Sequence, residues 1–258
     1  MTSGSGLPPL WCYWVVLPAT VLIWAVLAAT LETDLLPTPS AVMVALASEA
    51  VNGELWRHLA ATLARVAIAF GVAMLLGVVI GSAMGRSARL NALFDPLLVI
   101  LLNLPALVTI ILMYVWFGLV EMAALLAVII NKVPNVAVTV REGARSLDDK
   151  LEQMAVAYRF SRWQWLREVW LPQMFPYLMA ATRGGLALIW KIVLVVELLG
   201  RSNGVGFKLH LAFQVFDVAT ILAYSLAFIA VVQVIELAIL QPLERRANRW
   251  RRPEMAHA

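Results

Sequence analysis

Four long apolar runs without a single charged residue constrain the fold of this chain more than any other feature. They cover residues 10–31, 66–84, 96–120 and 218–235. Each reaches the ~18 consecutive apolar residues that a helix needs to cross the hydrocarbon core of a bilayer. Charged residues make up only 14% of the chain, against about 25% in soluble domains. The sequence therefore predicts an integral membrane protein.

Two further apolar runs contain isolated charges. Residues 121–140 include Lys132, and residues 176–200 include Arg183, Lys191 and Glu197. Because lipid does not tolerate exposed backbone, we expect both runs to be helices whose charges face protein or a water-filled cavity. The predicted fold class is thus an all-α polytopic membrane protein with six transmembrane helices.

The distribution of basic residues predicts the orientation. In a six-helix arrangement, 13 of the 20 Lys and Arg residues lie in three segments on one side of the membrane: 86–89, 141–167 and 245–252. The positive-inside rule places these segments, and both termini, in the cytoplasm. The net charge of +4 follows from this bias, so no nucleic-acid partner is predicted.

Motifs for catalysis and metal binding are missing from the sequence. Cys12 is the only cysteine, which excludes an internal disulfide and a cysteine-based metal site. The three histidines are scattered, and neither H-E-x-x-H nor G-x-S-x-G occurs, which disfavours a polytopic membrane enzyme. The chain also lacks G-x4-G-K-[ST], so we expect it neither to bind a cofactor nor to hydrolyse ATP.

A short amphipathic helix is expected between the first two spans. Apolar positions follow Ser40, a possible N-cap, at helical spacing, and Asn52 and Gly53 form a turn at the end. This spacing predicts a helix over about 40–51 on the outer face of the membrane.

Glycines recur every four residues in the second span, at Gly77, Gly81 and Gly85. Without side chains between them, two helix backbones approach closely, so this stripe indicates tight helix packing. Packing within one subunit is favoured over a dimer contact.

The longest polar insert, 141–172, lies between the fourth and fifth spans. Ser146 is a candidate N-cap for a first helix, and a second amphipathic segment carries Trp163, Leu166 and Trp170 on one stripe before Pro172, which is expected to end it. Two interpretations are open. The insert either lies in the membrane interface, where Trp beside basic residues is common, or it docks a cytoplasmic partner.

At this insert the sequence resembles the transmembrane subunits of bacterial ABC importers. Residues 151–172, "LEQMAVAYRFSRWQWLREVWLP", are similar to the family's cytoplasmic E-A-A-x3-G loop, and S-R-W-Q with a final L-P is typical of the nitrate/sulfonate/taurine branch. The resemblance extends over 36–252 and includes "LPTPSAVMVAL", "WFGL" and "VVELLGRSNGVGF". The family's Glu falls at Gln153, next to Glu152, and its Gly falls at Arg159.

The resemblance implies that the insert is a coupling helix that contacts an ATPase. The residues it assigns to this contact are Glu152, Gln153, Ala155, Arg159, Trp163, Leu166, Trp170, Leu171 and Pro172. It further implies a bacterial inner-membrane complex of two copies of this permease with two ABC ATPase subunits, which use ATP and Mg. A periplasmic or lipid-anchored binding protein would contact 201–217 and 40–51.

The resemblance divides the chain into a first helix with the outer helix (1–57), a permease core (58–252) with its loop at 141–172, and a cytoplasmic tail (253–258). Lys132, Lys191 and Glu197 are candidates for a pathway that carries a small anion such as nitrate, sulfonate or taurine, although a packing role is equally open. Alternatives are a permease for a lipid, vitamin or pyrimidine precursor, and a secondary transporter.

Overall fold

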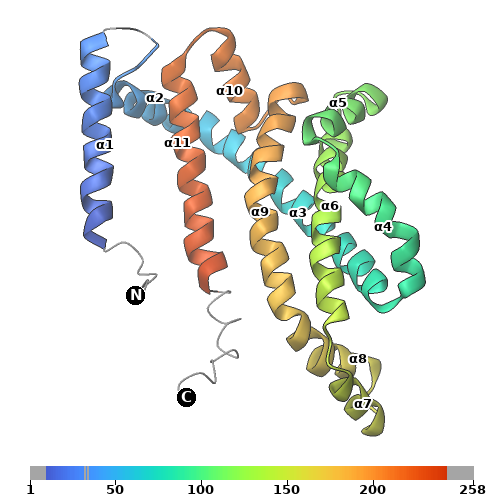
Figure 1. Ribbon diagram of the computed structural model, residues 1–258. Helices are drawn as coiled ribbons and strands as arrows, with labels where there is room; N and C mark the ends of the chain where they lie inside the picture. Colours follow the sequence, from blue (N-terminus) through green and yellow to red (C-terminus); the bar gives the residue numbers. More distant parts are fainter. Residues whose placement is uncertain (1–9, 32, 34, 243–258) are drawn as a thin grey trace.

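All regular structure in the described part of the chain is helical, which confirms the all-α prediction (Figure 1). The computed structural model describes residues 10–31, 33 and 35–242, so the predicted tail 253–258 and the basic segment 245–252 lie outside it. The elements are α1 (Leu10–Leu31), α2 (Pro39–Val51), α3 (Glu54–Arg86), α4 (Ala88–Asn103), α5 (Ala106–Phe117), α6 (Glu121–Arg145), α7 (Asp149–Ala157), α8 (Arg162–Gln164), the π-helix η1 (Trp165–Trp170), α9 (Leu171–Gly200), α10 (Val205–Gln214), α11 (Val218–Ile235) and the π-helix η2 (Glu236–Leu240).

Several of these helices are long enough to cross a membrane. Four stretches of the described residues meet the length and hydropathy required: Glu54–Arg86, Glu121–Arg145, Arg162–Gly200 and Val218–Leu240. The bent pair of α4 and α5 makes a fifth span if it is counted as one. The membrane class of the fold is therefore confirmed, while the count of six spans stays a prediction that also needs α1.

The apolar run 96–120, predicted as one continuous span, is broken into two helices. The chain breaks between Asn103 and Ala106, and α4 and α5 are bent by 97°. Leu104 has an extended conformation with φ −74° and ψ 121°. The cause is Pro105, because proline disfavours a helical conformation in the residue before it and has no N–H to continue the helical hydrogen bonds.

The short helix α2 begins slightly before the position expected from the sequence. The N-cap is Thr38, whose Oγ1 accepts a hydrogen bond from the Ala41 amide at 3.3 Å, and Pro39 is the first helical residue. The expectation of a cap at Ser40 is wrong because proline favours the first helical position and so moves the cap one residue ahead of itself.

Helices α3, α6 and α9 form the centre of the fold. Figure 1 shows α3 crossing behind α6 and α9. The three glycines of the predicted stripe lie against α6. A Cβ atom on Gly77 would come within 2.5 Å of the Val136 Cβ, and one on Gly85 within 2.5 Å of the Ala144 Cβ. Contacts this close require glycine on α3.

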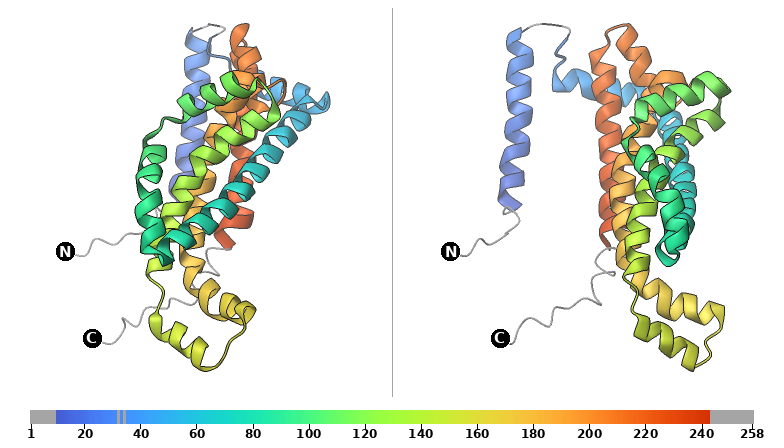
Figure 2. Two further views of the ribbon diagram at one scale, coloured as in Figure 1. Left: turned by 90° about the vertical axis from the view of Figure 1, so that its right-hand side faces the viewer. Right: turned by 45° about the vertical axis from the view of Figure 1, so that its right-hand side comes forward.

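The molecule has two distinct ends. Helices α7 and α8 project from one end, which we name the α7 end, and α2, α5 and α10 lie at the opposite end, the α2 end (Figures 1 and 2). The start of α1 and the end of η2 both point toward the α7 end. Helix α1 stands apart from the other long helices and is held near α2 by a hydrogen bond from the Trp24 indole N–H to the Pro37 carbonyl oxygen at 3.0 Å.

The α3–α6 contact predicts opposite effects for two glycine substitutions on one helix. A Cβ atom at Gly81 would lie 2.9 Å from the Val140 Cβ and still closer to the Ala137 oxygen, whereas one at Gly71 meets nothing within 4 Å. We expect Gly81→Ala to destabilise the protein by about 1–3 kcal/mol through overpacking. Gly71→Ala should leave stability unchanged or raise it by up to about 1 kcal/mol through helix propensity. The apparent Tm in detergent measures both, and equal losses at the two positions would contradict the close approach.

Candidate functional site

The polar insert forms a helical hairpin at the α7 end (Figure 2). Its first helix, α7, is capped by Asp148, whose Oδ1 accepts a hydrogen bond from the Lys150 amide at 2.8 Å. Ser146 is therefore not the N-cap, as the sequence suggested, but ends α6, where its hydroxyl contacts the Tyr177 hydroxyl at 2.8 Å. A second cap begins the return helix. Ser161 and Gln164 form a capping box, in which the backbone N–H of Gln164 donates to the Ser161 Oγ at 3.2 Å.

Between the two helices the chain turns through Arg159. This residue has φ +52°, in the left-handed region that favours glycine. The hairpin thus keeps the bend at the position where the resembled loop carries glycine, although an arginine side chain there costs on the order of 1 kcal/mol.

Pro172 does not end the return helix, so this prediction is wrong. Helical structure continues without interruption from Arg162 to Gly200, over 39 residues. Pro172 is the second residue of α9 and directly follows the π-helical turn Trp165–Trp170. Proline is tolerated here because it sits in the first turn of α9, where the wider π-helical turn has already interrupted the regular hydrogen bonds.

The aromatic stripe of the insert divides into two parts. Trp170 is 9% exposed and packs among buried side chains of α6 and α9 that include Val140 and Met174. Trp163 is 69% exposed. Two further side chains, Val156 of α7 and Tyr158 at its C-cap, are also exposed. The exposed side chains Val156, Tyr158 and Trp163 are named the hairpin surface below.

The other residues assigned to the insert's contact are mostly at the surface. Gln153, Arg159, Leu166, Leu171 and Pro172 are exposed and Ala155 is buried. Glu152 accepts a hydrogen bond of 2.5 Å from Arg86 at the end of α3, and the Arg86 guanidinium also stacks 4.5 Å above the Trp165 ring. These contacts fix the hairpin to the membrane helices.

A buried polar cluster joins the helices near the α2 end. Arg65 of α3 forms ion pairs of 2.6 Å with Glu197 of α9 and with Glu121 at the start of α6. Glu197 is fully buried and also accepts hydrogen bonds from the Thr62 hydroxyl at 2.8 Å and the Gly206 amide at 2.9 Å. The structure thus places Glu197, a predicted pathway residue, among protein partners that use both of its oxygens.

The same cluster holds the turn after α9. The Gly204 amide donates to His58 Nδ1 at 2.9 Å, and the Val205 amide donates to the Thr62 hydroxyl at 2.8 Å. Gly204 has φ +111°, and a Cβ atom there would overlap the Glu197 carboxylate. Sequence reasoning missed this cluster. Its signal was the spacing of His58, Thr62 and Arg65 along one face of α3, opposite the glycine-rich turn.

An ion pair outside the spanning helices links α2 to α10 and α11. Glu49 accepts hydrogen bonds from Lys208 Nζ at 3.0 Å and from the Tyr224 hydroxyl at 2.5 Å. Partial burial raises the pKa of the Glu49 carboxyl, but the hydrogen bonds from Tyr224 and Lys208 outweigh this effect, so its pKa is lowered.

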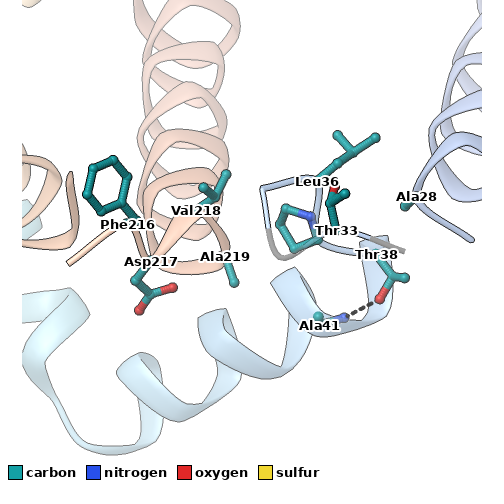
Figure 3. Close-up of a pocket in the computed structure, with 10 residues that line it drawn as sticks. Ala28, Thr33, Leu36, Thr38, Ala41, Phe216, Asp217, Val218 and Ala219 are labelled. Atoms are coloured by element: carbon teal, nitrogen blue, oxygen red, sulfur yellow. Dashed lines mark hydrogen bonds between the residues drawn. The ribbon is translucent and has the colours of Figure 1, made fainter. Parts of the chain in front are cut away.

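A hollow of about 490 Å³ lies between α1, α2 and the start of α11 (Figure 3). Its lining is mainly apolar, with the hydroxyls of Thr33 and Thr38 on one side. Asp217, opposite them, caps α11 by accepting a hydrogen bond from the Thr220 amide at 3.0 Å. The hollow contains none of the predicted pathway or ATPase-contact residues, but Ala41, Phe216 and Asp217 belong to the segments predicted to contact a binding protein.

The two membrane lysines lie in different surroundings. Lys132 is 3% exposed and packs against Gly185 of α9. Lys191 is exposed on α9. Within the described residues neither ammonium makes a hydrogen bond or ion pair. The structure therefore does not bring Lys132, Lys191 and Glu197 together.

Comparison with known proteins identifies the family. Residues 73–242 match the family described as binding-protein-dependent transport system inner membrane component. The chain belongs to this family. A Bacillus subtilis (strain 168) relative named as an aliphatic sulfonates transport permease, SsuC, is 30% identical over 93% of this chain and 88% of its own length. The taurine transport system permease TauC of Escherichia coli (strain K12) is also 30% identical, over 88% of this chain and 84% of its own.

A solved chain of the MetNI methionine ABC transporter in an inward-facing conformation shares the fold of this inner membrane component. The TM-score is 0.65 at 17% identity, over 78% of this chain and 99% of that chain.

Removing one partner of the buried ion pair should be far more harmful than removing a surface pair. Arg65→Met leaves the Glu197 carboxylate buried without its charge partner, for which we expect a loss of about 3–5 kcal/mol. The control is Arg57→Met, which breaks an exposed pair with Glu54 on the same helix and should cost about 0–1 kcal/mol. Apparent Tm values of the inner membrane component test this difference. Comparable losses would show that the cluster does not stabilise the fold.

The turn at Arg159 predicts that glycine restores an unstrained conformation. Arg159→Gly should slow proteolytic cleavage between the two hairpin helices and raise stability by about 1 kcal/mol. Arg162→Gly is the matched control. It removes the same side chain from the first helical position of α8, where glycine lowers helix propensity. Faster cleavage of Arg159→Gly than of the wild type would contradict the left-handed turn.

Proposed function

We propose that this chain is the membrane-spanning subunit of an ABC importer for small sulfonate-type anions, such as alkanesulfonates or taurine. The hairpin at the α7 end carries the proposal, because it projects an exposed tryptophan beyond the spanning helices at the position where the resemblance expects contact with an ATPase. Relatives named for aliphatic sulfonates and for taurine support the substrate class, since both match over most of their length.

The hairpin surface is the proposed contact with the ATPase. Val156, Tyr158 and Trp163 are large, exposed apolar side chains on an element that projects away from the bundle. Tryptophan and tyrosine are enriched among the residues that contribute most to protein interfaces. In this proposal the partner ATPase subunits bind ATP and Mg, and the permease contributes no catalytic group. The permease instead transmits the motion of the ATPase to the membrane helices.

The proposed assembly contains two copies of the permease, each with six spans and with both termini in the cytoplasm. Helix α1 supplies the sixth span, and α4 with α5 the bent one. The orientation is supported by the start of α1 and the end of η2, which point toward the α7 end. A substrate-binding protein would then dock at the α2 end, on 201–217 and α2, where Phe213, Val215 and Phe216 are exposed.

Other substrates remain the second candidate. A permease for a lipid, a vitamin or a pyrimidine precursor would use the same hairpin, but would not need two membrane-helix lysines that pair with none of the described residues. An uptake experiment with radiolabelled taurine separates these cases: alkanesulfonates should compete with taurine in a sulfonate importer and not in the other permeases. A secondary transporter would purify without any ATPase.

Copurification of an ATPase tests the proposal. A P-loop ATPase should purify with the tagged wild-type protein and be lost with Trp163→Ala, because this change removes the largest side chain of the hairpin surface. The control is Trp56→Ala, which removes a similarly exposed tryptophan at the α2 end and should retain the ATPase. Trp170 is unsuitable for this test because its burial makes Trp170→Ala a folding variant. If no ATPase accompanies the wild type, the proposed function is wrong.

A further inference from the structure

A line of polar side chains runs along one face of α6. Asn131, Asn135 and Thr139 recur at intervals of four, which places them on one helix face. All three are half-buried, and each donates a hydrogen bond to the carbonyl oxygen four residues earlier, at 2.9, 3.0 and 3.0 Å. An asparagine amide carries a second N–H and a carbonyl oxygen. The line therefore keeps hydrogen-bonding groups available inside a membrane span.

The register of α6 against α9 places Lys191 near this line. The two helices run antiparallel, with Lys132 beside Gly185 and Gly143 beside Tyr177. In this register, Lys191 lies about 6 Å, or one helical turn, closer to the α2 end than Asn131 does.

The exposed face of α9 lies on the same side as the α6 line. Gly184, Leu188, Lys191 and Val195 are exposed at helical spacing. The two helices run antiparallel in this register. Because of this, the α6 face with Asn131 and Asn135 points to the same side of the helix pair as the exposed face of α9. Helix α3 packs on the other side of α6 and α9, behind both in Figure 1. We name Asn131, Asn135, Thr139 and Lys191 the α6–α9 polar face.

A lipid environment does not suit this face. A charged side chain within a span is costly in hydrocarbon and faces protein partners or water instead. Lys191 is exposed and makes no ion pair with the described residues. The exposed face of α3 is different, because side chains such as Leu75 and Val79 are purely apolar there. The chain thus has one face suited to lipid and one suited to water.

We infer that the α6–α9 polar face lines a water-filled path for the oxoanion head group of the substrate. This inference rests on the proposed function, in which a second copy of the permease closes the path. The Lys191 ammonium supplies the positive charge, and the amides of Asn131 and Asn135 and the Thr139 hydroxyl follow it toward the α7 end. One charged group followed by neutral ones binds an anion and still lets it leave. Glu197 and Lys132 lie outside this face, since Glu197 is saturated by protein partners and Lys132 is buried against Gly185 of α9.

Cysteine labelling in native membrane vesicles tests the path without any assumption about the substrate. In a Cys12→Ser background, Asn135→Cys is exposed to two membrane-impermeant methanethiosulfonates, one anionic and one cationic, and each rate is normalised to that of free cysteine. We expect both reagents to react, with the anionic one favoured by about tenfold because of the nearby Lys191 charge. Lys191→Met should abolish this preference and Lys191→Arg should keep it.

The control for labelling is Leu75→Cys on the apolar face of α3, which should react with neither reagent. If Asn135→Cys is equally unreactive, the polar face is not in contact with water and the inference is overturned, even if an ATPase copurifies. If labelling occurs without a charge preference, Lys191 does not supply the anion's charge, and the inference is likewise overturned.

Uptake of radiolabelled taurine tests the role of Lys191 directly. Lys191→Met should lower uptake at least tenfold while the copurified ATPase is retained, and Lys191→Arg should restore most of it. The control is Ser225→Ala on α11, where a hydroxyl also donates to the carbonyl four residues earlier, at 2.7 Å, but outside the polar face. Wild-type uptake by Lys191→Met would remove this residue from the path. If the wild type itself takes up no sulfonate, the proposed substrate is wrong. The labelling result still shows whether the α6–α9 polar face is in contact with water.

Discussion

The structure depends on one buried ion pair, between Arg65 and Glu197. A carboxylate with no solvent exposure is tolerable only if its charge and its hydrogen-bonding positions are satisfied by protein. Meeting this requirement fixes three separate parts of the chain: α3 through Arg65 and Thr62, α9 through Glu197, and the start of α10 through the Gly206 amide. Arg65 extends the constraint to α6 through Glu121. The α2 end is therefore held together by electrostatics within an otherwise apolar bundle.

This constraint matters because Glu197 lies near the end of an unbroken helical stretch. The stretch begins at Arg162 in the hairpin and ends at Gly200, so the hairpin and the polar cluster occupy its two ends. A continuous helix carries a displacement of one end to the other, whereas a helix that stopped at Pro172 would not. In the proposed importer, motion of an ATPase at the hairpin would reach the turn 201–206 through this single element, and the glycine contacts of α3 with α6 would move with it.

Local features of the sequence predicted the class of the fold and the two short helices of the insert, because apolar runs and helical periodicity need no knowledge of distant residues. The errors at both caps and at both prolines were also local. The rule for residues that precede proline explains the break at Leu104, and the π-helical turn explains why Pro172 continues a helix. The remaining features depend on packing. Trp163 and Trp170 share one stripe in the sequence, but only Trp170 faces α6 once the hairpin folds back. The partners Arg65 and Glu197 are 132 residues apart, a pairing that no single-sequence pattern reveals.

Polar groups in the membrane helices fall into two kinds, and this division connects structure to function. Glu197 and Thr62 bond to other helices and turns, so their polarity stabilises one arrangement of the chain. Asn131, Asn135 and Thr139 bond only to their own helix, and Lys191 bonds to none of the described residues. Groups of the second kind add little to helix packing and remain able to bind a substrate that moves along the helices. In a chain with so few charges, a lysine without a partner on an open helix face is therefore better explained by a ligand than by the fold.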